Sequence, residues 1–313
     1  LAKRLTDKTF ADFVCFQNSG TEATEASIKI ARKYFHKIGN PEKNRIITFK
    51  GAFHGRTLAA LFAANNSKHI EGFGPKVGGF DHFVFGNHKS LKKKISKNTA
   101  AIMVETIMGE GGIKVIPDWF LKKLRQICNK KNILLILDEV QCGIGRSGDF
   151  FAFEKSKVKP DIVPIAKGIG GGFPIGAVLM NRKVASGMTA GTHGSTFGGN
   201  ALTTAAGWAS AKYIIETDLP AEAAKSGKYL HSMLDVIKER HDIESVRGFG
   251  LLLGLELKKN KSQAVIERCL SKGLLLNAVR PNVIRFFPPL NVSEGEMNQA
   301  VKILEEALEE EKI

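Results

Sequence analysis

Two periodicities alternate along the first two thirds of the chain. Apolar residues recur every three or four positions over residues 1–13, 20–37 and 118–131, which predicts helices there. Short apolar runs, typical of buried strands, lie at residues 45–49, 100–105, 133–137, 161–166 and 175–180. Strands that are apolar throughout need helices on both faces of their sheet, so the pattern predicts an α/β fold with a mostly parallel sheet.

The pattern changes after about residue 215. Helices are predicted over residues 219–240, 261–272 and 293–310, around short strands near 246–257 and 283–287. Ser293 and Glu296 have the spacing of a capping box at the start of the last helix. We therefore expect a large domain over residues 1–205 and a smaller α+β domain over residues 206–313.

Length and composition fit this division, and the first residue leads us to expect that the chain is incomplete. Its 313 residues, 43% of them hydrophobic, are enough for a substantial core. The chain begins at Leu1, inside a predicted helix and without an initiator methionine. We therefore expect the N-terminal part of the large domain to be missing. No signal peptide is visible, although a missing N-terminus could hide one.

The charge balance is strongly basic, with 46 Lys and Arg against 31 Asp and Glu and a net charge of +15. Such a charge is compatible with nucleic-acid binding, but the lysines are scattered along helices, as in LKKKISK, without aromatic residues between them. A solvated basic surface that attracts anionic substrates explains the charge better. No apolar run reaches the roughly 18 residues of a membrane span. We expect neither a nucleic acid nor a membrane as partner.

The four cysteines give no sign of a disulfide framework or a metal site. Cys15, Cys128, Cys142 and Cys269 form no CxxC pair, and no histidine lies at metal-ligand spacing from them. This usage predicts a reduced, cytoplasmic protein without a metal site.

Three of the predicted strands end in charged residues. Glu105, Asp138 and Lys167 follow apolar runs, and ligands bind at the carboxyl ends of strands in an open parallel sheet. The stretch LLILDE resembles the magnesium-binding strand of a P-loop nucleotidase. The required G-x-x-x-x-G-K-[ST] motif is absent, because Tyr229 follows the one Gly-Lys pair. The nucleotidase alternative stays open only if the motif lies in a missing N-terminus.

The chemistry of pyridoxal phosphate (PLP) fits these residues better. PLP needs a lysine nucleophile, an acid that holds its pyridine nitrogen protonated, and a phosphate site. Lys167, which precedes GIGGGFP, is a candidate nucleophile, and Asp138 would pair with the pyridinium. Small residues in NSGTEA (18–23) would offer backbone N–H groups to the phosphate, although an ordinary capped helix start has the same pattern.

Seven motifs together identify a family. They are, in order, NSGTEA, GAFHGRT, VETIMGEGG, LDEVQCGIGRSG, IAKGIGGGFPIGAV, GTHGSTFGGN and VIRFFPPL. The chain resembles the class III (ornithine-type) PLP-dependent aminotransferases over essentially its whole length. GMTAGTHGSTFGGN (187–200) most favours the subgroup that acts on acetylornithine and often also on succinyldiaminopimelate. The resemblance implies the type I fold of PLP-dependent transferases and an obligate homodimer with shared active sites.

The resemblance also implies the roles of cofactor-binding residues. Lys167 would bind PLP covalently and shuttle the substrate proton, while Asp138 would pair with the pyridine nitrogen. The other implied contacts are Gly20 and Thr21 at the phosphate, Phe53 and Val140 on the two ring faces, Gln141 near the phenolic oxygen, and Thr196 at the phosphate of the neighbouring subunit's cofactor.

Substrate binding would rest on two arginines, whose planar forks suit carboxylates. The resemblance implies that Arg56 binds the α-carboxylate of acetylornithine or the distal carboxylate of glutamate. Arg285 would bind the α-carboxylate of glutamate, and Glu110 would cover Arg285 when the amine substrate is bound. Ser195 and Glu105 would lie near the substrate.

Two positions depart from the family's pattern. Thr106 stands where a proline is usual, and Thr21 stands where acetylornithine enzymes often have alanine. Ornithine or 4-aminobutyrate remains possible as the amine donor, because a few pocket residues decide specificity. A non-catalytic protein with the PLP fold is the remaining alternative.

Overall fold

The computed structural model describes residues 1–313 apart from the side chain of His88. The chain forms two compact units. Unit 1 comprises Leu1–Thr106, Ile116–Gln141 and Phe153–Tyr213, and unit 2 comprises Ile107–Val115, Cys142–Ala152 and Ile214–Ile313. The predicted division into a large domain over residues 1–205 and a small domain over residues 206–313 stays a prediction.

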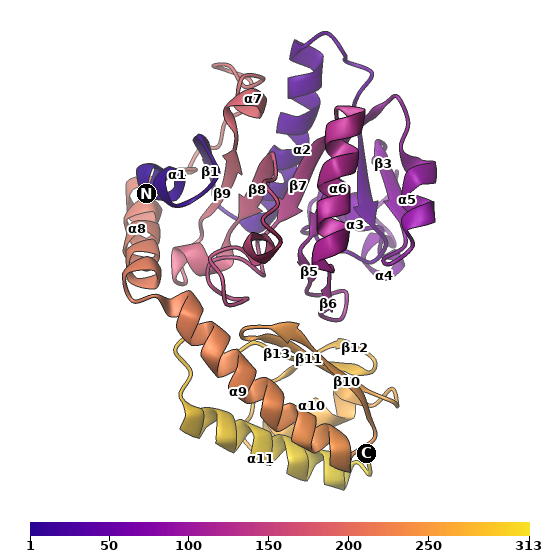
Figure 1. Cartoon of the computed structure of the whole chain (residues 1–313), viewed down its shortest axis with the longest axis vertical. Helices are drawn as coiled ribbons and strands as arrows, with labels where there is room; N and C mark the ends of the chain where they lie inside the picture. Colours follow the sequence, from indigo (N-terminus) through magenta and orange to yellow (C-terminus); the bar gives the residue numbers. More distant parts are fainter. The chain divides into compact units, whose positions relative to one another are not determined.

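The helices and strands of unit 1 alternate along the chain (Figure 1). Its strands are β1 (Phe13–Gln17), β2 (Arg45–Phe49), β3 (Phe80–Phe83), β4 (Thr99–Glu105), β7 (Leu134–Asp138), β8 (Ile162–Ile165) and β9 (Gly176–Met180). Its α-helices are α1 (Ala2–Lys8), α2 (Gly20–Lys37), α3 (Leu58–Ala64), α4 (Ser67–Ile70), α5 (His88–Lys94), α6 (Asp118–Lys131), α7 (Arg182–Ala185) and α8 (Ala201–Glu216), which continues into unit 2. Two 3-10 helices, η1 (Ala152–Ser156) and η2 (Lys167–Gly170), lie beside β8 in sequence.

The strands of unit 1 form one seven-stranded sheet in the order β1-β9-β8-β7-β4-β2-β3. Strand β9 runs antiparallel to both of its neighbours, and the other pairings in this sheet are parallel. The predicted α/β fold with a mostly parallel sheet is confirmed. This order places the carboxyl ends of β2, β4, β7 and β8 at one edge of the sheet.

Helices α2 and α6 cover opposite faces of this sheet (Figure 1). The apolar face of α2 packs against Met103 of β4 and Ile136 of β7, which belong to the same buried cluster. Phe49 points to the other face, where its ring lies 6.5 Å from the ring of Phe120 in α6. Side chains alternate between the faces of a strand, so apolar residues at successive positions serve both layers.

The predicted helix over residues 1–13 is wrong beyond Lys8. Residues Phe13–Gln17 form β1, which pairs antiparallel with Gly176–Met180 of β9. The partner strand lies about 160 residues away in sequence, so a local pattern could not reveal it. Strand β3 was not predicted either. The short strands predicted near 246–257 correspond to two strands joined by a turn.

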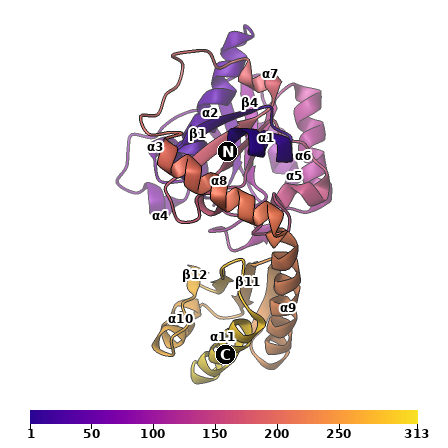
Figure 2. The ribbon, with the colours of Figure 1, turned by 90° about the vertical axis from the view of Figure 1, so that its left-hand side faces the viewer.

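Unit 2 is built on a four-stranded antiparallel sheet in the order β10-β11-β13-β12. Its strands are β10 (Ile243–Phe249), β11 (Leu252–Leu257), β12 (Asn277–Arg280) and β13 (Val283–Phe286), and its helices are α9 (Leu219–Arg240), α10 (Ser262–Ser271) and α11 (Glu294–Glu310). The three helices pack against one face of the sheet (Figure 2). The expected capping box of Ser293 and Glu296 is present at the start of α11.

The other face of this sheet carries a small hairpin. Strands β5 (Ile107–Met108) and β6 (Lys114–Val115) pair with each other, and Ile107 and Ile113 pack with Leu252 of β11. This contact explains why a segment that follows β4 in sequence belongs to unit 2. No described helix in either unit is both long enough and apolar enough to cross a membrane.

Candidate active site

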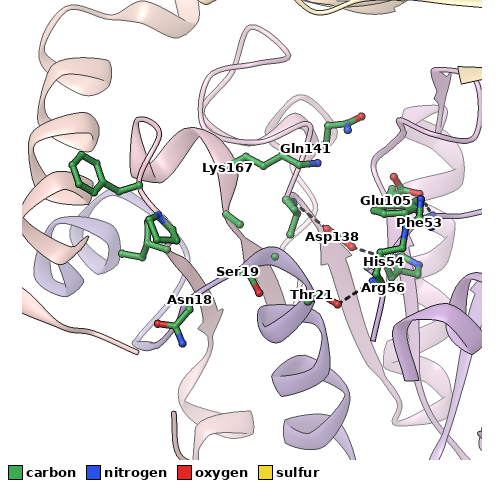
Figure 3. Close-up of a pocket in the computed structure, with 17 residues that line it drawn as sticks. Asn18, Ser19, Thr21, Phe53, His54, Arg56, Glu105, Asp138, Gln141 and Lys167 are labelled. Carbon is green, nitrogen blue, oxygen red and sulfur yellow. Dashed lines mark hydrogen bonds and ion pairs between the residues drawn. The ribbon is translucent and has the colours of Figure 1, made fainter. Parts of the chain in front are cut away.

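A cavity of about 430 Å³ lies at the carboxyl edge of the sheet in unit 1 (Figure 3). Its walls come from the start of α2, the loop after β2, the ends of β4 and β7, and the segment between β8 and β9. Nine of the predicted residues line it: Gly20, Thr21, Phe53, Arg56, Glu105, Asp138, Val140, Gln141 and Lys167. The topology of the sheet therefore brings together residues that are far apart in sequence.

Asp138 ends β7 and is only 3% exposed. His54 Nδ1 lies 2.8 Å from its Oδ2, and the backbone N–H of Val140 donates to its Oδ1 at 3.0 Å. A buried carboxylate is costly without such partners. These two contacts hold the carboxylate at the cavity wall in a defined orientation (Figure 3).

His54 is a functional candidate that the sequence analysis missed. It is buried, and its interaction with Asp138 forms an ion pair when the imidazole is protonated. Burial alone would lower the pKa of His54, but the hydrogen bond and charge of Asp138, with the nearby charge of Glu105, raise that pKa above its usual value. The available signal was its place between Phe53 and Arg56 in the motif GAFHGRT.

Glu105 orients the loop that carries Phe53. The carboxylate ends β4, is 5% exposed, and accepts a hydrogen bond from the backbone N–H of Phe53 at 2.9 Å. The guanidinium of Arg56 lies 5.5 Å from the centre of the Phe53 ring, within cation–π range. Glu105 therefore acts on the cavity through the backbone of this loop.

The start of α2 forms another wall of the cavity. Ser19 is the N-cap, and its hydroxyl accepts from the backbone N–H of Glu22 at 3.2 Å. A Cβ atom on Gly20 would lie 2.6 Å from Cγ1 of Val140, so only glycine fits at the first turn. The positive end of this 18-residue helix and the backbone N–H groups of its first turn favour an anion here.

The hydroxyl of Thr21 is used within the protein. Its Oγ1 accepts from the backbone N–H groups of Arg56 at 3.2 Å and Thr57 at 3.3 Å. Thr21 therefore ties α2 to the loop after β2, which explains how threonine is accommodated at this position (Figure 3).

The other departure from the family's pattern, Thr106, also has a physical explanation. Its hydroxyl donates to Oε1 of Glu139 at 2.7 Å. Glu139 is fully buried, and the same oxygen accepts from the backbone N–H of Phe153 at 3.3 Å. A proline at position 106 could not supply this hydroxyl.

Lys167 begins η2, two residues after the end of β8. Its φ is 49°, in the left-handed region that residues other than glycine rarely adopt, and such conformations concentrate at functional sites. The side chain extends across the cavity toward Gln141 (Figure 3). Lys167 is exposed, so the described residues do not shield it from water.

The cavity meets the chemical requirements of PLP. It offers a lysine amine, a buried carboxylate whose orientation is fixed, and a helix start suited to a phosphate group. The apolar side chains of Phe53 and Val140 also line the cavity. The residues present therefore fit this cofactor.

Ser195 and Thr196 do not line this cavity. They line a second one, of about 460 Å³, in unit 1. The hydroxyl of Ser195 accepts from Nδ2 of Asn18 at 3.0 Å and from the backbone N–H of Gly198 at 3.1 Å. Asn18 lines both cavities, so it connects this loop to the start of α2.

Arg285 and Glu110 meet in unit 2. Nη1 of Arg285 lies 2.6 Å from Oε1 of Glu110, which belongs to the turn between β5 and β6. Arg285 and Glu110 therefore form an ion pair within unit 2. The Arg285 side chain is 14% exposed and the Glu110 side chain is 35% exposed, so the arginine is largely buried and the glutamate is partly exposed.

Comparison with known proteins identifies the family. The chain matches the aminotransferase class-III family over residues 1–308. It is 46% identical over 309 residues to the acetylornithine aminotransferase of Rhodobacter capsulatus. This alignment covers 98% of this chain and 78% of the relative. The structure of the ornithine aminotransferase from Toxoplasma gondii matches with a TM-score of 0.94 and 31% identity, over 99% of this chain and 76% of that one.

A solved acetylornithine aminotransferase from Elizabethkingia anophelis matches with a TM-score of 0.85 and 31% identity, over 99% of this chain and 77% of that one. The chain therefore belongs to the class-III aminotransferases. The fold predicted from the sequence is confirmed by these structures. The predicted enzyme class, a transaminase that uses PLP, is confirmed as well.

We expect replacement of His54 by phenylalanine to lower the free energy of unfolding by about 3 kcal/mol, because Asp138 would lose a buried partner. The raised pKa of His54 stabilises the folded state fully below the unfolded pKa of about 6.5, and this contribution is lost as pH rises through the folded value. The deficit should therefore be larger at about pH 6 than at about pH 9. Urea unfolding at both pH values measures it.

His54→Gln is the matched control, because glutamine can donate to Asp138 but does not titrate. It should show a smaller deficit with less dependence on pH. An equal deficit for His54→Phe at both pH values would contradict a raised pKa of His54 beside Asp138.

Proposed function

We propose that this chain transfers the terminal amino group of N2-acetylornithine to 2-oxoglutarate, a step of arginine biosynthesis. The same site would also accept succinyldiaminopimelate in lysine biosynthesis. The named relative from Rhodobacter capsulatus supports this substrate through 46% identity over 309 residues. The motif GMTAGTHGSTFGGN (187–200), which resembles the acetylornithine subgroup, also supports it.

The observation that carries the proposal is the convergence of Lys167, Asp138 and the start of α2 on one cavity. Any one of these features has a structural explanation by itself. Together they supply the amine, the acid partner and the anion site that transamination requires. PLP, when bound, supplies an electron-withdrawing ring that lets a proton leave the carbon bearing the amino group.

The residues of the chain have separate tasks in this proposal. The amine of Lys167 would hold the cofactor and would move the substrate proton between carbon atoms. Asp138, oriented by His54, would keep the ring nitrogen protonated. Phe53 and Val140 would contact the two faces of the ring, and Gln141 would contact its phenolic oxygen. Backbone N–H groups at Gly20 and Thr21 would bind the phosphate.

Two arginines bind the carboxylates of the substrates. Arg56 lines the cavity and binds the α-carboxylate of acetylornithine or the distal carboxylate of glutamate. Arg285 binds the α-carboxylate of glutamate, and Glu110 covers it when the amine substrate is present. Their 2.6 Å contact supports this exchange, because it places a protein carboxylate where a substrate carboxylate would compete. Glu105 positions the loop of Phe53 and Arg56 beside the substrate.

The active enzyme is a homodimer with shared active sites in this proposal. Thr196 reaches the phosphate of the neighbouring subunit's cofactor, and Ser195 lies near the substrate. Exposed apolar side chains of unit 1 support a second copy as the partner, among them Phe197 at 67% and Leu202 at 66% exposure. A cytoplasmic location is part of the proposal and is supported by the four free cysteines.

Ornithine as amine donor is the second candidate, since the enzyme from Toxoplasma gondii matches with a TM-score of 0.94. We expect kcat/KM to be highest for acetylornithine in a comparison with ornithine, 4-aminobutyrate and succinyldiaminopimelate. The reason is that relatives of this chain at higher identity are named acetylornithine aminotransferase. A higher value for ornithine would reverse the assignment of substrate while leaving the class unchanged.

We expect borohydride reduction in the presence of PLP to label Lys167, located by digestion and mass measurement, because its amine forms the covalent link. Lys167→Ala should lower kcat by at least about 1,000-fold. Lys159→Ala, which removes an exposed lysine of the same unit, is the control and should keep full activity. A label spread over surface lysines, or turnover by Lys167→Ala, would contradict the site.

Shared sites predict complementation between two inactive variants. A mixed dimer of Lys167→Ala and Thr196→Val has one site with both native residues and one site with neither. After dissociation and random reassociation, the mixture should recover roughly a quarter of wild-type activity, from one intact site in half of the dimers. Activity that never exceeds the average of the two parent variants would contradict sharing of Thr196 across the dimer.

A further inference from the structure

Arg285 has a second anchor besides Glu110. Its Nη2 donates to Oδ1 of Asn277 at 3.0 Å, whereas its Nη1 contacts Glu110 at 2.6 Å. The two partners therefore bind different nitrogen atoms of one guanidinium group. They also differ in charge, because Asn277 is neutral and Glu110 is a carboxylate.

The sheet of unit 2 explains this arrangement. Asn277 of β12 and Arg285 of β13 are directly paired across the two strands, so both side chains lie on the same face. Gly254 of β11 is the partner of Arg285 on its other side. A Cβ atom on Gly254 would lie 2.9 Å from Cβ of Ile113, which shows how closely the β5–β6 hairpin approaches this face. The hairpin thereby brings Glu110 to Arg285.

The guanidinium also rests on an aromatic ring. Cζ of Arg285 lies 5.6 Å from the centre of the Phe287 ring, and Cζ of Arg146 lies 4.0 Å from the same centre. Asn277 and Phe287 are both uncharged. If a substrate carboxylate displaces Glu110, these two contacts can therefore remain and keep the guanidinium in place without competing for its charge.

We propose that Asn277 is a positioning residue that holds Arg285 for the dicarboxylate substrate and so helps to determine specificity between the two halves of the reaction. This inference rests on the role given to Arg285 in the proposed function. The neutral amide of Asn277 fixes the orientation of the Arg285 guanidinium without neutralising its positive charge, so that charge can attract the ligand. A carboxylate at position 277 would instead neutralise Arg285 from a second side and oppose an incoming carboxylate.

The test compares the kcat/KM of the PLP-loaded enzyme for 2-oxoglutarate with its kcat/KM for acetylornithine. In a ping-pong reaction each value reports its own half-reaction. Asn277→Asp should lower kcat/KM for 2-oxoglutarate about fivefold, the effect of about 1 kcal/mol for a partly exposed ion pair. Its value for acetylornithine should change less than about twofold.

Two further variants complete the design. Asn277→Leu removes the acceptor without adding charge and should also lower kcat/KM for 2-oxoglutarate selectively, though less than Asn277→Asp. Asn291→Asp makes the same charge change at an exposed turn of unit 2 and should alter neither half-reaction. A response of Asn277→Asp equal to that of Asn291→Asp, or an equal loss in both half-reactions, would overturn the role of Asn277.

Arg285→Leu separates this inference from the proposed function. It should lower kcat/KM for 2-oxoglutarate far more than Asn277→Asp does. If Arg285→Leu has no such effect, the role of Arg285 and with it that of Asn277 are both wrong. If Arg285→Leu does lower it while both Asn277 variants behave as wild type, only the role of Asn277 is wrong.

Discussion

The arrangement of the site depends on the hydrogen bonds of the buried carboxylate of Asp138. At 3% exposure it needs hydrogen-bond donors for both oxygens, and it receives them from the ring of His54 and the backbone of Val140. His54 belongs to the loop after β2, whereas Val140 follows β7. One carboxylate therefore joins two strand ends, and its orientation determines how a ring nitrogen can approach it.

The topology of the sheet supplies the other components to the same place. Parallel strands β2, β4, β7 and β8 end at one edge, and the antiparallel strand β9 begins there. Loops from all of these ends, together with the start of α2, line the cavity. No local motif needs to contain the site, because each segment contributes one or two groups and the sheet fixes their spacing.

The sequence alone determined the local features of the protein. Apolar runs predicted the central strands, and the polar residues at their ends predicted Glu105 and Asp138 as candidates for a site. The capping box of Ser293 with Glu296 was also evident, because capping depends on residues close together in sequence. The ordered motifs predicted the family, since they preserve the chemistry of the site.

The tertiary structure alone decided which distant residues become partners. Strand β1 exists because β9 is available to pair with it, and it begins at Phe13, where the sequence pattern still predicted helix. The pairings of His54 with Asp138, Thr106 with Glu139, and Asn277 with Arg285 likewise join residues from separate segments. Sequence periodicity reports which face of an element is buried. Periodicity does not report which side chains of other elements pack against that buried face, because those contacts depend on strand order, register and the course of the loops.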